Sequence, residues 1–368
     1  MELPTTAEVV VVGGGVMGAA TLYNLARHGC TDVVLIEREA IASGSTSKAA
    51  GGFRAQFSDE LNIRIALRAI DHLARFSDEV GTEIDFRRNG YLFLLDDDGM
   101  ESFRPSVMLQ NSLGVASRLI EVEEVEGMVP GVRTDDLAGA AYCATDGQAT
   151  PEAVTLGYAA AARAMGARLV TGCRVRSLDV EDGRITGVTT DLGNVSTRRV
   201  VLAAGIWSVD LAAAAGLSLP VRPEKRHVWL SGPDPMPRHL PLTIDFATGF
   251  YFHREGERLL MGGPHQTVEA FAADAVDRLP LAESLGVTPA WWGYYGMSPD
   301  HNAIVGAAAD PAGLMYACGF SGHGFQQGPV VGEYLAALCL DEAPPLDLSA
   351  MTVERFASGA VRPEANVV

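Results

Sequence analysis

Three glycines near the start of the chain, Gly13, Gly15 and Gly18, have the spacing G-x-G-x-x-G. The first can form a tight turn, the second admits a pyrophosphate close to the backbone, and the third packs a helix against a strand. Glu37 follows at the distance at which an acidic side chain accepts hydrogen bonds from an adenosine ribose. This carboxylate favours a free 2′-hydroxyl, so the pattern fits FAD or NAD better than NADP.

The residues around these glycines have the composition of a strand–helix–strand unit. Val9 to Val12 and Val33 to Ile36 are apolar runs typical of strands buried on both faces. The apolar residues 19–26 predict a helix whose N-terminus faces the phosphates, and Gly29 can close that helix. The glycine motif therefore has the context of a dinucleotide site, which an isolated glycine turn lacks.

The segment after Glu37 is a loop of small residues that ends in a single cation. Residues 41–53 are rich in serine, threonine, glycine and alanine, which offer donors with little bulk to a phosphate or an isoalloxazine edge. A flexible surface loop is the alternative. Arg54 closes the segment, either as a group for binding an anion or as part of a surface salt bridge.

Chain length, net charge and cysteine spacing restrict the class of protein. With 368 residues the chain is long enough for two domains, and a net charge of −18 argues against nucleic acid and against an anionic membrane surface. The five cysteines are widely spaced and include no C-x-x-C pair, so we expect reduced thiols and no metal site. Residues 1–7 have no signal-peptide pattern, and no apolar run is long enough to span a bilayer, so we expect a cytoplasmic location.

The rest of the chain alternates between two kinds of sequence. Strands followed by glycine turns recur at 200–207 and 314–325, and the second is followed by a helix over 328–340. Between them, from Pro220, the chain is rich in aromatic residues and proline, which predicts an antiparallel sheet facing a cavity. We therefore expect a dinucleotide domain of three pieces (1–85, 145–218 and 296–368) and a substrate domain of two (86–144 and 219–295).

Several motifs together resemble the D-amino-acid-oxidase-like flavoproteins, in the branch of sarcosine oxidase, glycine oxidase and proline or dimethylglycine dehydrogenase. They are STSKAAGGFR (45–54), AAGIWS (203–208), YYGMSPDH (294–301) and GFSGHGF (319–325), and they cover essentially the whole chain in the right order. The resemblance implies an α/β fold with two domains, a Rossmann-like FAD domain and an inserted antiparallel-sheet domain. This is the para-hydroxybenzoate hydroxylase or glutathione reductase type.

The resemblance also assigns roles to residues. Cofactor contacts are implied at Gly13, Gly15, Val16, Met17, Glu37, Arg38, Ser45, Thr46, Ser47, Lys48, Ala49, Val175, Ala204, Gly205, Trp207, Gly319, Gly322, His323, Gly324, Phe325 and Gln326. A substrate pocket is implied at Arg54, Phe252, His265, Tyr295 and Gln326, in which Arg54 binds a carboxylate.

The chain differs at four positions from the flavoproteins that it resembles. Gln326 stands where a lysine helps to bind the carboxylate, and Met261 where a lysine activates oxygen. Gly293 and Lys48 stand where relatives link the flavin through cysteine or histidine. These departures predict non-covalent FAD, and Met261 favours a dehydrogenase over an oxidase.

The implied reaction is oxidation of a C–N bond in an amino acid or in a secondary or tertiary amine. A hydride would pass to flavin N5, and the imine would then hydrolyse. The alternatives are a dehydrogenase subunit that passes electrons to a partner, an NAD-dependent dehydrogenase, and a flavin-binding protein without turnover. The expected partners are a small amine, oxygen or another electron acceptor, and an assembly with copies of itself or other subunits.

Overall fold

The structure, a computed structural model, describes residues 2–367. One half of the molecule is built on a six-stranded sheet in the order β18-β19-β12-β1-β2-β8, in which only the β18–β19 pair is antiparallel. Its strands are β1 (Val9–Val12), β2 (Val33–Ile36), β8 (Arg168–Val170), β12 (Val200–Leu202), β18 (Ile304–Ala307) and β19 (Leu314–Cys318).

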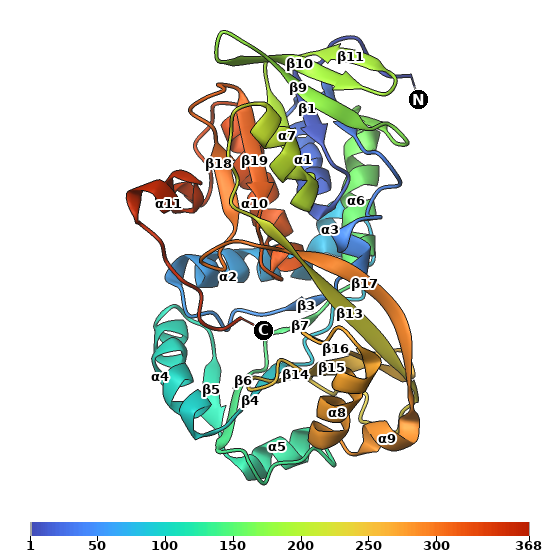
Figure 1. The fold of residues 1–368 in the computed structure, drawn as a ribbon, viewed down its shortest axis with the longest axis vertical. Helices are drawn as coiled ribbons and strands as arrows, with labels where there is room; N and C mark the ends of the chain where they lie inside the picture. Colours follow the sequence, from blue (N-terminus) through green and yellow to red (C-terminus); the bar gives the residue numbers. More distant parts are fainter. Residues whose placement is uncertain (1, 368) are drawn as a thin grey trace.

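Both faces of this sheet are covered, as the all-valine β1 predicts. Val9 and Val11 pack in a core with helices α1 (Val16–Arg27), α6 (Pro151–Ala164) and α10 (Gly324–Cys339). Val10 and Val12 pack on the opposite side, under the three-stranded sheet β9 (Val175–Glu181), β10 (Arg184–Thr190) and β11 (Gly193–Ser196) and helix α7 (Ser208–Ala214). Figure 1 shows this half at the top.

The other half contains an eight-stranded sheet in the order β17-β13-β16-β15-β14-β4-β6-β5. Its strands are β4 (Tyr91–Leu95), β5 (Ser117–Ile120), β6 (Gly139–Cys143), β13 (Arg222–Pro233), β14 (Leu242–Asp245), β15 (Tyr251–Glu255), β16 (Arg258–Gly263) and β17 (Val287–Met297). The predicted antiparallel sheet is present, except that β4 and β14 run parallel. Four helices accompany it: α4 (Asp97–Ser112), α5 (Val122–Met128), α8 (Val268–Arg278) and α9 (Leu281–Leu285).

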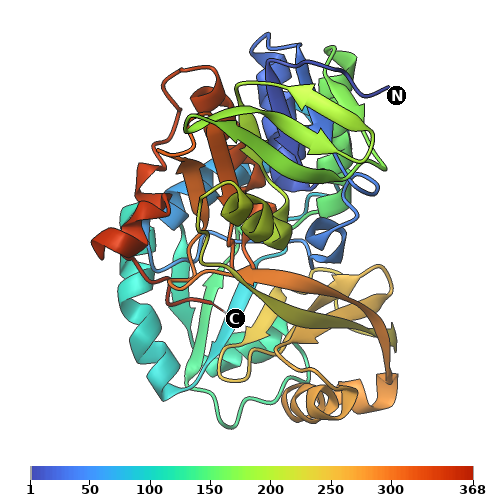
Figure 2. The same cartoon turned by 45° about the horizontal axis from the view of Figure 1, so that its top comes forward.

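Two long paired strands, β13 and β17, extend from the lower half towards the upper one (Figures 1 and 2). Helix α2 (Glu60–Ala74) lies between the halves and packs against α10. The remaining elements are short: η1 (Ser45–Lys48), β3 (Gly52–Phe53), α3 (Phe76–Val80), β7 (Gly147–Gln148), η2 (Gly205–Trp207), η3 (Ser349–Met351) and α11 (Glu354–Ser358). The proposed domain boundaries remain a prediction.

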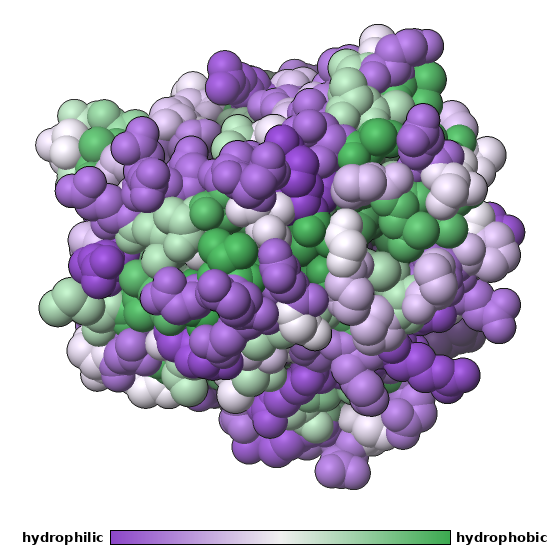
Figure 3. All heavy atoms as spheres, turned by 90° about the horizontal axis from the view of Figure 1, so that it is seen from below, coloured by the Kyte–Doolittle hydropathy of each residue, from purple (hydrophilic) through white to green (hydrophobic). Residues whose placement is uncertain are grey.

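The face of the molecule seen from below is largely polar, and the cysteines form no disulfides within residues 2–367. In Figure 3 most of the face seen from below is hydrophilic, and hydrophobic residues form separate groups between polar ones. All five cysteines are buried and unpaired. Within residues 2–367 no helix has both the length and the apolar character needed to cross a membrane.

Candidate active site

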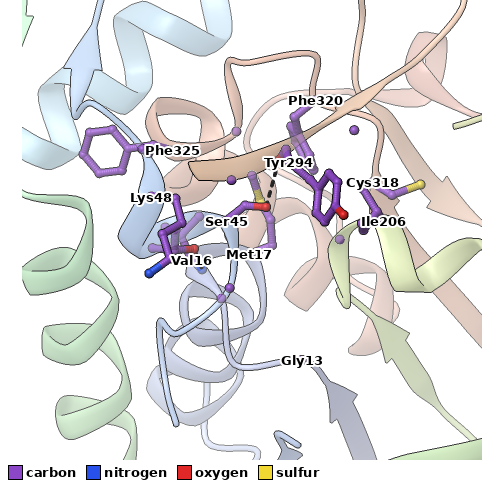
Figure 4. Close-up of a pocket in the computed structure, with 18 of the residues that line it drawn as sticks. Gly13, Val16, Met17, Ser45, Lys48, Ile206, Tyr294, Cys318, Phe320 and Phe325 are labelled. Atoms are coloured by element: carbon purple, nitrogen blue, oxygen red, sulfur yellow. Dashed lines mark hydrogen bonds between the residues drawn. The ribbon is translucent and has the colours of Figure 1, made fainter. Parts of the chain in front are cut away.

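A cavity of about 480 Å³ lies where the two large sheets meet. One end is lined by the turn after β1, the end of β2 and the start of β9, and the other end by β4, β13, β14, β15 and β17. The loop 43–54 and the loop 319–325 form walls between these ends. Figure 4 shows residues of η1, the start of α1, β17 and the loop 319–325 around this cavity.

The turn between β1 and α1 is shaped to receive an anion. Gly13 has φ of +109°, and a Cβ there would lie 2.5 Å from the carbonyl oxygen of Ala203. Helix α1 then begins after Gly15, which has no side chain to cap it, and the first turn of α1 has no acidic residue. The N–H groups at this helix end therefore suit a pyrophosphate, and the residues present fit FAD.

Glu37 lines the same end of the cavity with its carboxylate held in place. One oxygen accepts a hydrogen bond from the N–H of Gly14 at 2.6 Å, and the other accepts from the N–H of Glu39 at 2.8 Å. The guanidinium of Arg38 stacks 3.8 Å from the ring centre of Trp207. These groups, with Val175, Ala204 and Gly205, form the wall at the nucleotide end.

The small-residue loop packs closely against β17. Ser45 donates its hydroxyl to the carbonyl of Tyr294 at 2.9 Å (Figure 4), and Trp291 donates its indole N–H to the carbonyl of Lys48 at 3.1 Å. A Cβ at Gly293 would lie 2.7 Å from Cβ of Lys48, so a larger residue there would push the loop and the strand apart. Thr46 accepts a hydrogen bond from the N–H of Val16 at 3.1 Å, which joins the loop to α1.

Most of the predicted cofactor residues line the cavity. They are Gly13, Gly15, Val16, Met17, Glu37, Arg38, Ser45, Thr46, Lys48, Ala49, Val175, Ala204, Gly205, Trp207, Gly319, Gly322, His323, Gly324 and Phe325. Ser47 and Gln326 are not on the lining. The hydroxyl of Ser47 donates instead to the carbonyls of Ser43 and Gly44 within its own turn.

Gln326 supports Arg54 from behind the cavity. Its side-chain oxygen accepts from the N–H of Arg54 at 2.7 Å, and its amide donates to the carbonyl of Arg54 at 3.2 Å. The prediction that Gln326 contacts cofactor and substrate is therefore not supported by its position. The reciprocal pair fixes the backbone that carries Arg54 instead.

The guanidinium of Arg54 lies on the cavity wall but is engaged by the protein. It is 4% exposed, and it donates to the carbonyls of Gln56 and Asn366, the latter at 2.5 Å. It lies 4.0 Å from the ring centre of Phe57 and 3.4 Å from Nε2 of His323. Burial and the nearby Arg54 charge lower the pKa of His323 well below its usual range, so a neutral imidazole faces the guanidinium.

Strand alternation places two other predicted positions, Phe252 and Met261, away from the cavity. Phe252 and Met261 are fully buried on the far face of the sheet, in the core with Trp229 and Phe271 of α8. Tyr251, one residue before Phe252, lines the cavity. Because successive side chains of a strand point to opposite faces, an offset of one residue exchanges a pocket residue for a core residue. Met261 consequently gives no information about the electron acceptor.

His265 also lies outside the cavity. It follows β16, and its Nε2 is 2.7 Å from a carboxylate oxygen of Asp274 on α8. Its ring packs edge-on against Phe271. The position supports a structural role for His265 and not contact with a substrate.

Besides Tyr294, three tyrosines line the cavity at the large sheet: Tyr91, Tyr251 and Tyr295. Burial raises the pKa of all three, to about 12 for Tyr91, so their hydroxyls stay protonated and can donate hydrogen bonds. Tyr91 and a further cavity residue, Arg226, were not predicted from the sequence. The signal that could have found them is the two-residue period of β4 and β13, continued from a known cavity position.

Asp146 is a buried acid behind Arg54. It is 0% exposed and accepts hydrogen bonds from the N–H of Ala55 at 3.0 Å and the amide of Gln56 at 3.3 Å. Burial raises its pKa from 3.8 to about 7. The folded protein thus keeps a proton that the unfolded chain releases, so this residue favours the folded state at low pH, and that contribution is lost as the pH rises towards 7.

Replacing Asp146 by asparagine is therefore expected to flatten the pH dependence of stability between pH 4 and 7. Wild-type unfolding free energy should carry a decrease of up to about 1.4 kcal/mol per pH unit from this residue, which Asp146→Asn removes. The asparagine keeps a side-chain oxygen that can accept the hydrogen bond from the N–H of Ala55. Urea unfolding at several pH values measures the slope, and Asp135→Asn at an exposed position is the control. Equal slopes in wild type and Asp146→Asn would contradict the assignment.

Comparison with known proteins agrees with this site. The family model DAO, described as FAD dependent oxidoreductase, matches residues 8–338. A solved L-proline dehydrogenase from P. horikoshii is 32% identical, with a TM-score of 0.90 over 98% of this chain and 100% of that one. FAD-dependent oxidoreductase domain-containing protein 1 of Xenopus laevis is 31% identical, over 99% of this chain and 85% of that protein.

A third relative is much longer than this chain. Human mitochondrial sarcosine dehydrogenase is 28% identical over 96% of this chain, but the match covers only 42% of that protein. The chain thus spans less than half of this curated relative.

Proposed function

The chain belongs to the DAO family of FAD-dependent oxidoreductases, and we propose that it oxidises a C–N bond of an amino acid or of a secondary or tertiary amine. The observation that carries this proposal is one continuous cavity, from the glycine turn at β1 to the tyrosines at the large sheet. The two relatives named proline and sarcosine dehydrogenase support a substrate whose nitrogen bears a second carbon.

The residues at the tyrosine end suit an amine that also carries an anionic group. Two guanidinium groups, of Arg54 and Arg226, line this part, whereas the lining carboxylates Glu37 and Asp210 belong to the nucleotide end. The protonated hydroxyls of the tyrosines can orient a polar substrate by donating hydrogen bonds. Because no carboxylate of residues 2–367 lines this end, we propose that the amine binds in its neutral form.

The bound FAD supplies the hydride acceptor in this proposal. The chain positions the substrate and excludes water. Tyr295 packs against Gly322, and a Cβ at Gly322 would lie 2.8 Å from the ring of Tyr295. That contact joins β17 to the loop 319–325 and closes one wall of the cavity. The product is an imine, which hydrolyses in water.

The test is anaerobic bleaching of the flavin absorbance by a panel of amines. The panel contains sarcosine, glycine, proline, D-amino acids and larger N-alkyl amino acids. We expect one class to bleach the flavin, and the rate of reoxidation on admitting air then separates an oxidase from a dehydrogenase that needs another acceptor. A yellow protein that no member bleaches would contradict the proposed substrate class.

We further propose that the FAD is not covalently bound. Of the two cysteines on the lining, Cys173 and Cys318, burial raises the pKa of Cys318 to about 12, which keeps its thiol protonated. A protonated thiol is a poor nucleophile. Acid precipitation should therefore release the yellow colour into the supernatant, and colour retained in a washed pellet would contradict this prediction.

A further inference from the structure

We propose that Arg226, and not Arg54, binds the carboxylate of the substrate. This inference rests on the proposed function, because it assigns one group of the proposed amino acid to one residue. Both guanidinium groups line the cavity, so the question is which of them has hydrogen-bonding capacity left for a ligand.

Arg226 is held in the cavity wall by the register of β13. It stands directly opposite Gly293 of β17, which has no side chain, and its guanidinium carbon lies 5.3 Å from the ring centre of Tyr295. Val228, two residues along the same strand, also lines the cavity, as the alternation of a strand requires. The side chain is 14% exposed.

The hydrogen bonds of Arg226 are incomplete. Nη2 lies 2.8 Å from a carboxylate oxygen of Glu224, but Nε and Nη1 are buried without any acceptor among residues 2–367. Nη1 carries two N–H groups, and a buried donor left without an acceptor is costly. A carboxylate arriving from the cavity can accept from Nη1 and from the second N–H of Nη2, in the forked geometry that guanidinium groups favour.

Arg54, in contrast, already has acceptors inside the protein. Its two terminal nitrogens donate to the carbonyls of Gln56 and Asn366, and its face covers the ring of Phe57. Asn366 belongs to a C-terminal segment in which the carboxylate of Glu364 accepts hydrogen bonds from Ser58 and Asn62. Arg54 thus joins this segment to the loop 54–58, which is a structural task.

The tyrosine cluster complements Arg226. Tyr251 and Tyr295 line the same end of the cavity as Arg226, and the guanidinium carbon lies 5.3 Å from the ring centre of Tyr295. A carboxylate there would meet the charge of Arg226 and phenolic donors together. Glu224, with 36% of its side chain exposed, pairs only with Nη2 of the guanidinium.

The experiment compares Arg226→Gln with Arg54→Gln in the FAD-loaded protein. Arg222→Gln, at an exposed position four residues earlier on β13, is the matched control. Two readouts are used for each variant. The first is the Kd of acetate, a carboxylate that cannot be oxidised, from its perturbation of the flavin spectrum. The second is the anaerobic reduction rate with proline and with pyrrolidine, which lacks the carboxylate, or with the corresponding pair for whichever amine bleaches the flavin.

We expect Arg226→Gln to raise the Kd of acetate and to reduce the preference for the amino acid over the amine by about 10- to 100-fold, the usual effect of losing a charged hydrogen-bonding partner. Arg226→Lys should recover part of this loss because it keeps the charge. Arg54→Gln should change both values less than about threefold while lowering the melting temperature. Arg222→Gln should change neither.

The opposite pattern would overturn the assignment: a loss of acetate binding and of amino-acid preference in Arg54→Gln equal to or larger than that in Arg226→Gln. Because acetate binding needs no turnover, it tests Arg226 even if no amine reduces the flavin. Failure of the whole amine panel would count against the proposed function, whereas the acetate result alone decides the role of Arg226.

Discussion

Replacing Gly18 by alanine is expected to abolish most FAD binding. A Cβ at this position would lie 1.9 Å from the carbonyl oxygen of Gly13, inside the turn that presents the N-terminus of α1. The methyl group must push the helix away from β1, and the pyrophosphate then loses the N–H groups that hold it. We expect the purified variant to retain about a tenth or less of the wild-type FAD, with activity reduced in proportion, because this spacing is what the dinucleotide motif requires.

The ratio of flavin absorbance to protein absorbance measures this effect. Gly29→Ala is the control, because Gly29 closes the same helix and a Cβ there meets nothing within 4 Å, although its φ of +87° is positive. The control should keep its FAD and lose only about 1 kcal/mol of stability from backbone strain. A Gly18→Ala protein with a full complement of FAD would show that the turn can relax, and that FAD binding does not depend on the close contact between Gly18 and Gly13.

Replacing Arg278 by methionine is expected to produce the largest loss of stability in the half of the molecule built on the eight-stranded sheet. Arg278 is 3% exposed and binds two acids: its Nε is 3.0 Å from Asp245, and its terminal nitrogens are 2.8 Å from the two oxygens of Asp136. Asp245 is itself 2% exposed. Removing the cation leaves a buried carboxylate without its partner, which costs about 3–5 kcal/mol.

Urea unfolding of the FAD-loaded protein measures this loss. The neighbouring Asp277→Ala breaks a surface pair with Arg133, whose side chains are 60% and 34% exposed, and should cost about 1 kcal/mol or less. Adding Asp245→Asn to Arg278→Met should recover part of the loss, because the uncompensated charge is removed. Equal effects of Arg278→Met and Asp277→Ala would refute the buried network as a source of stability.

The nucleotide half of the site could be predicted from the sequence because its signals are local. Gly13, Gly15, Gly18 and Glu37 occupy one strand–helix–strand unit, and their spacing alone fixes their relation in space. The resemblance to flavoproteins also predicted that the distant loop 319–325 contacts the cofactor, and this loop lines the same cavity. Neither step required knowledge of how the large sheet pairs.

The substrate half depends on strand register, which the sequence does not display. Tyr251 and Phe252 are adjacent aromatics, and only the pairing of β15 with β14 and β16 shows which one faces the cavity. Arg226 could not be predicted for the same reason, because its position depends on pairing with Gly293, which is distant in the sequence. Arg54 stood out in sequence as a lone cation, but its partner Asn366 lies 312 residues away.

The alternation of β13 and β15 separates two kinds of evolutionary change. Arg226, Val228 and Tyr251 face the cavity, whereas Trp229 and Phe252 pack in the hydrophobic core beneath α8. A mutation at a cavity-facing position changes what the enzyme selects without opening a void in the core. New specificities can therefore arise along these strands at every second codon, while the codons between them stay under selection for folding.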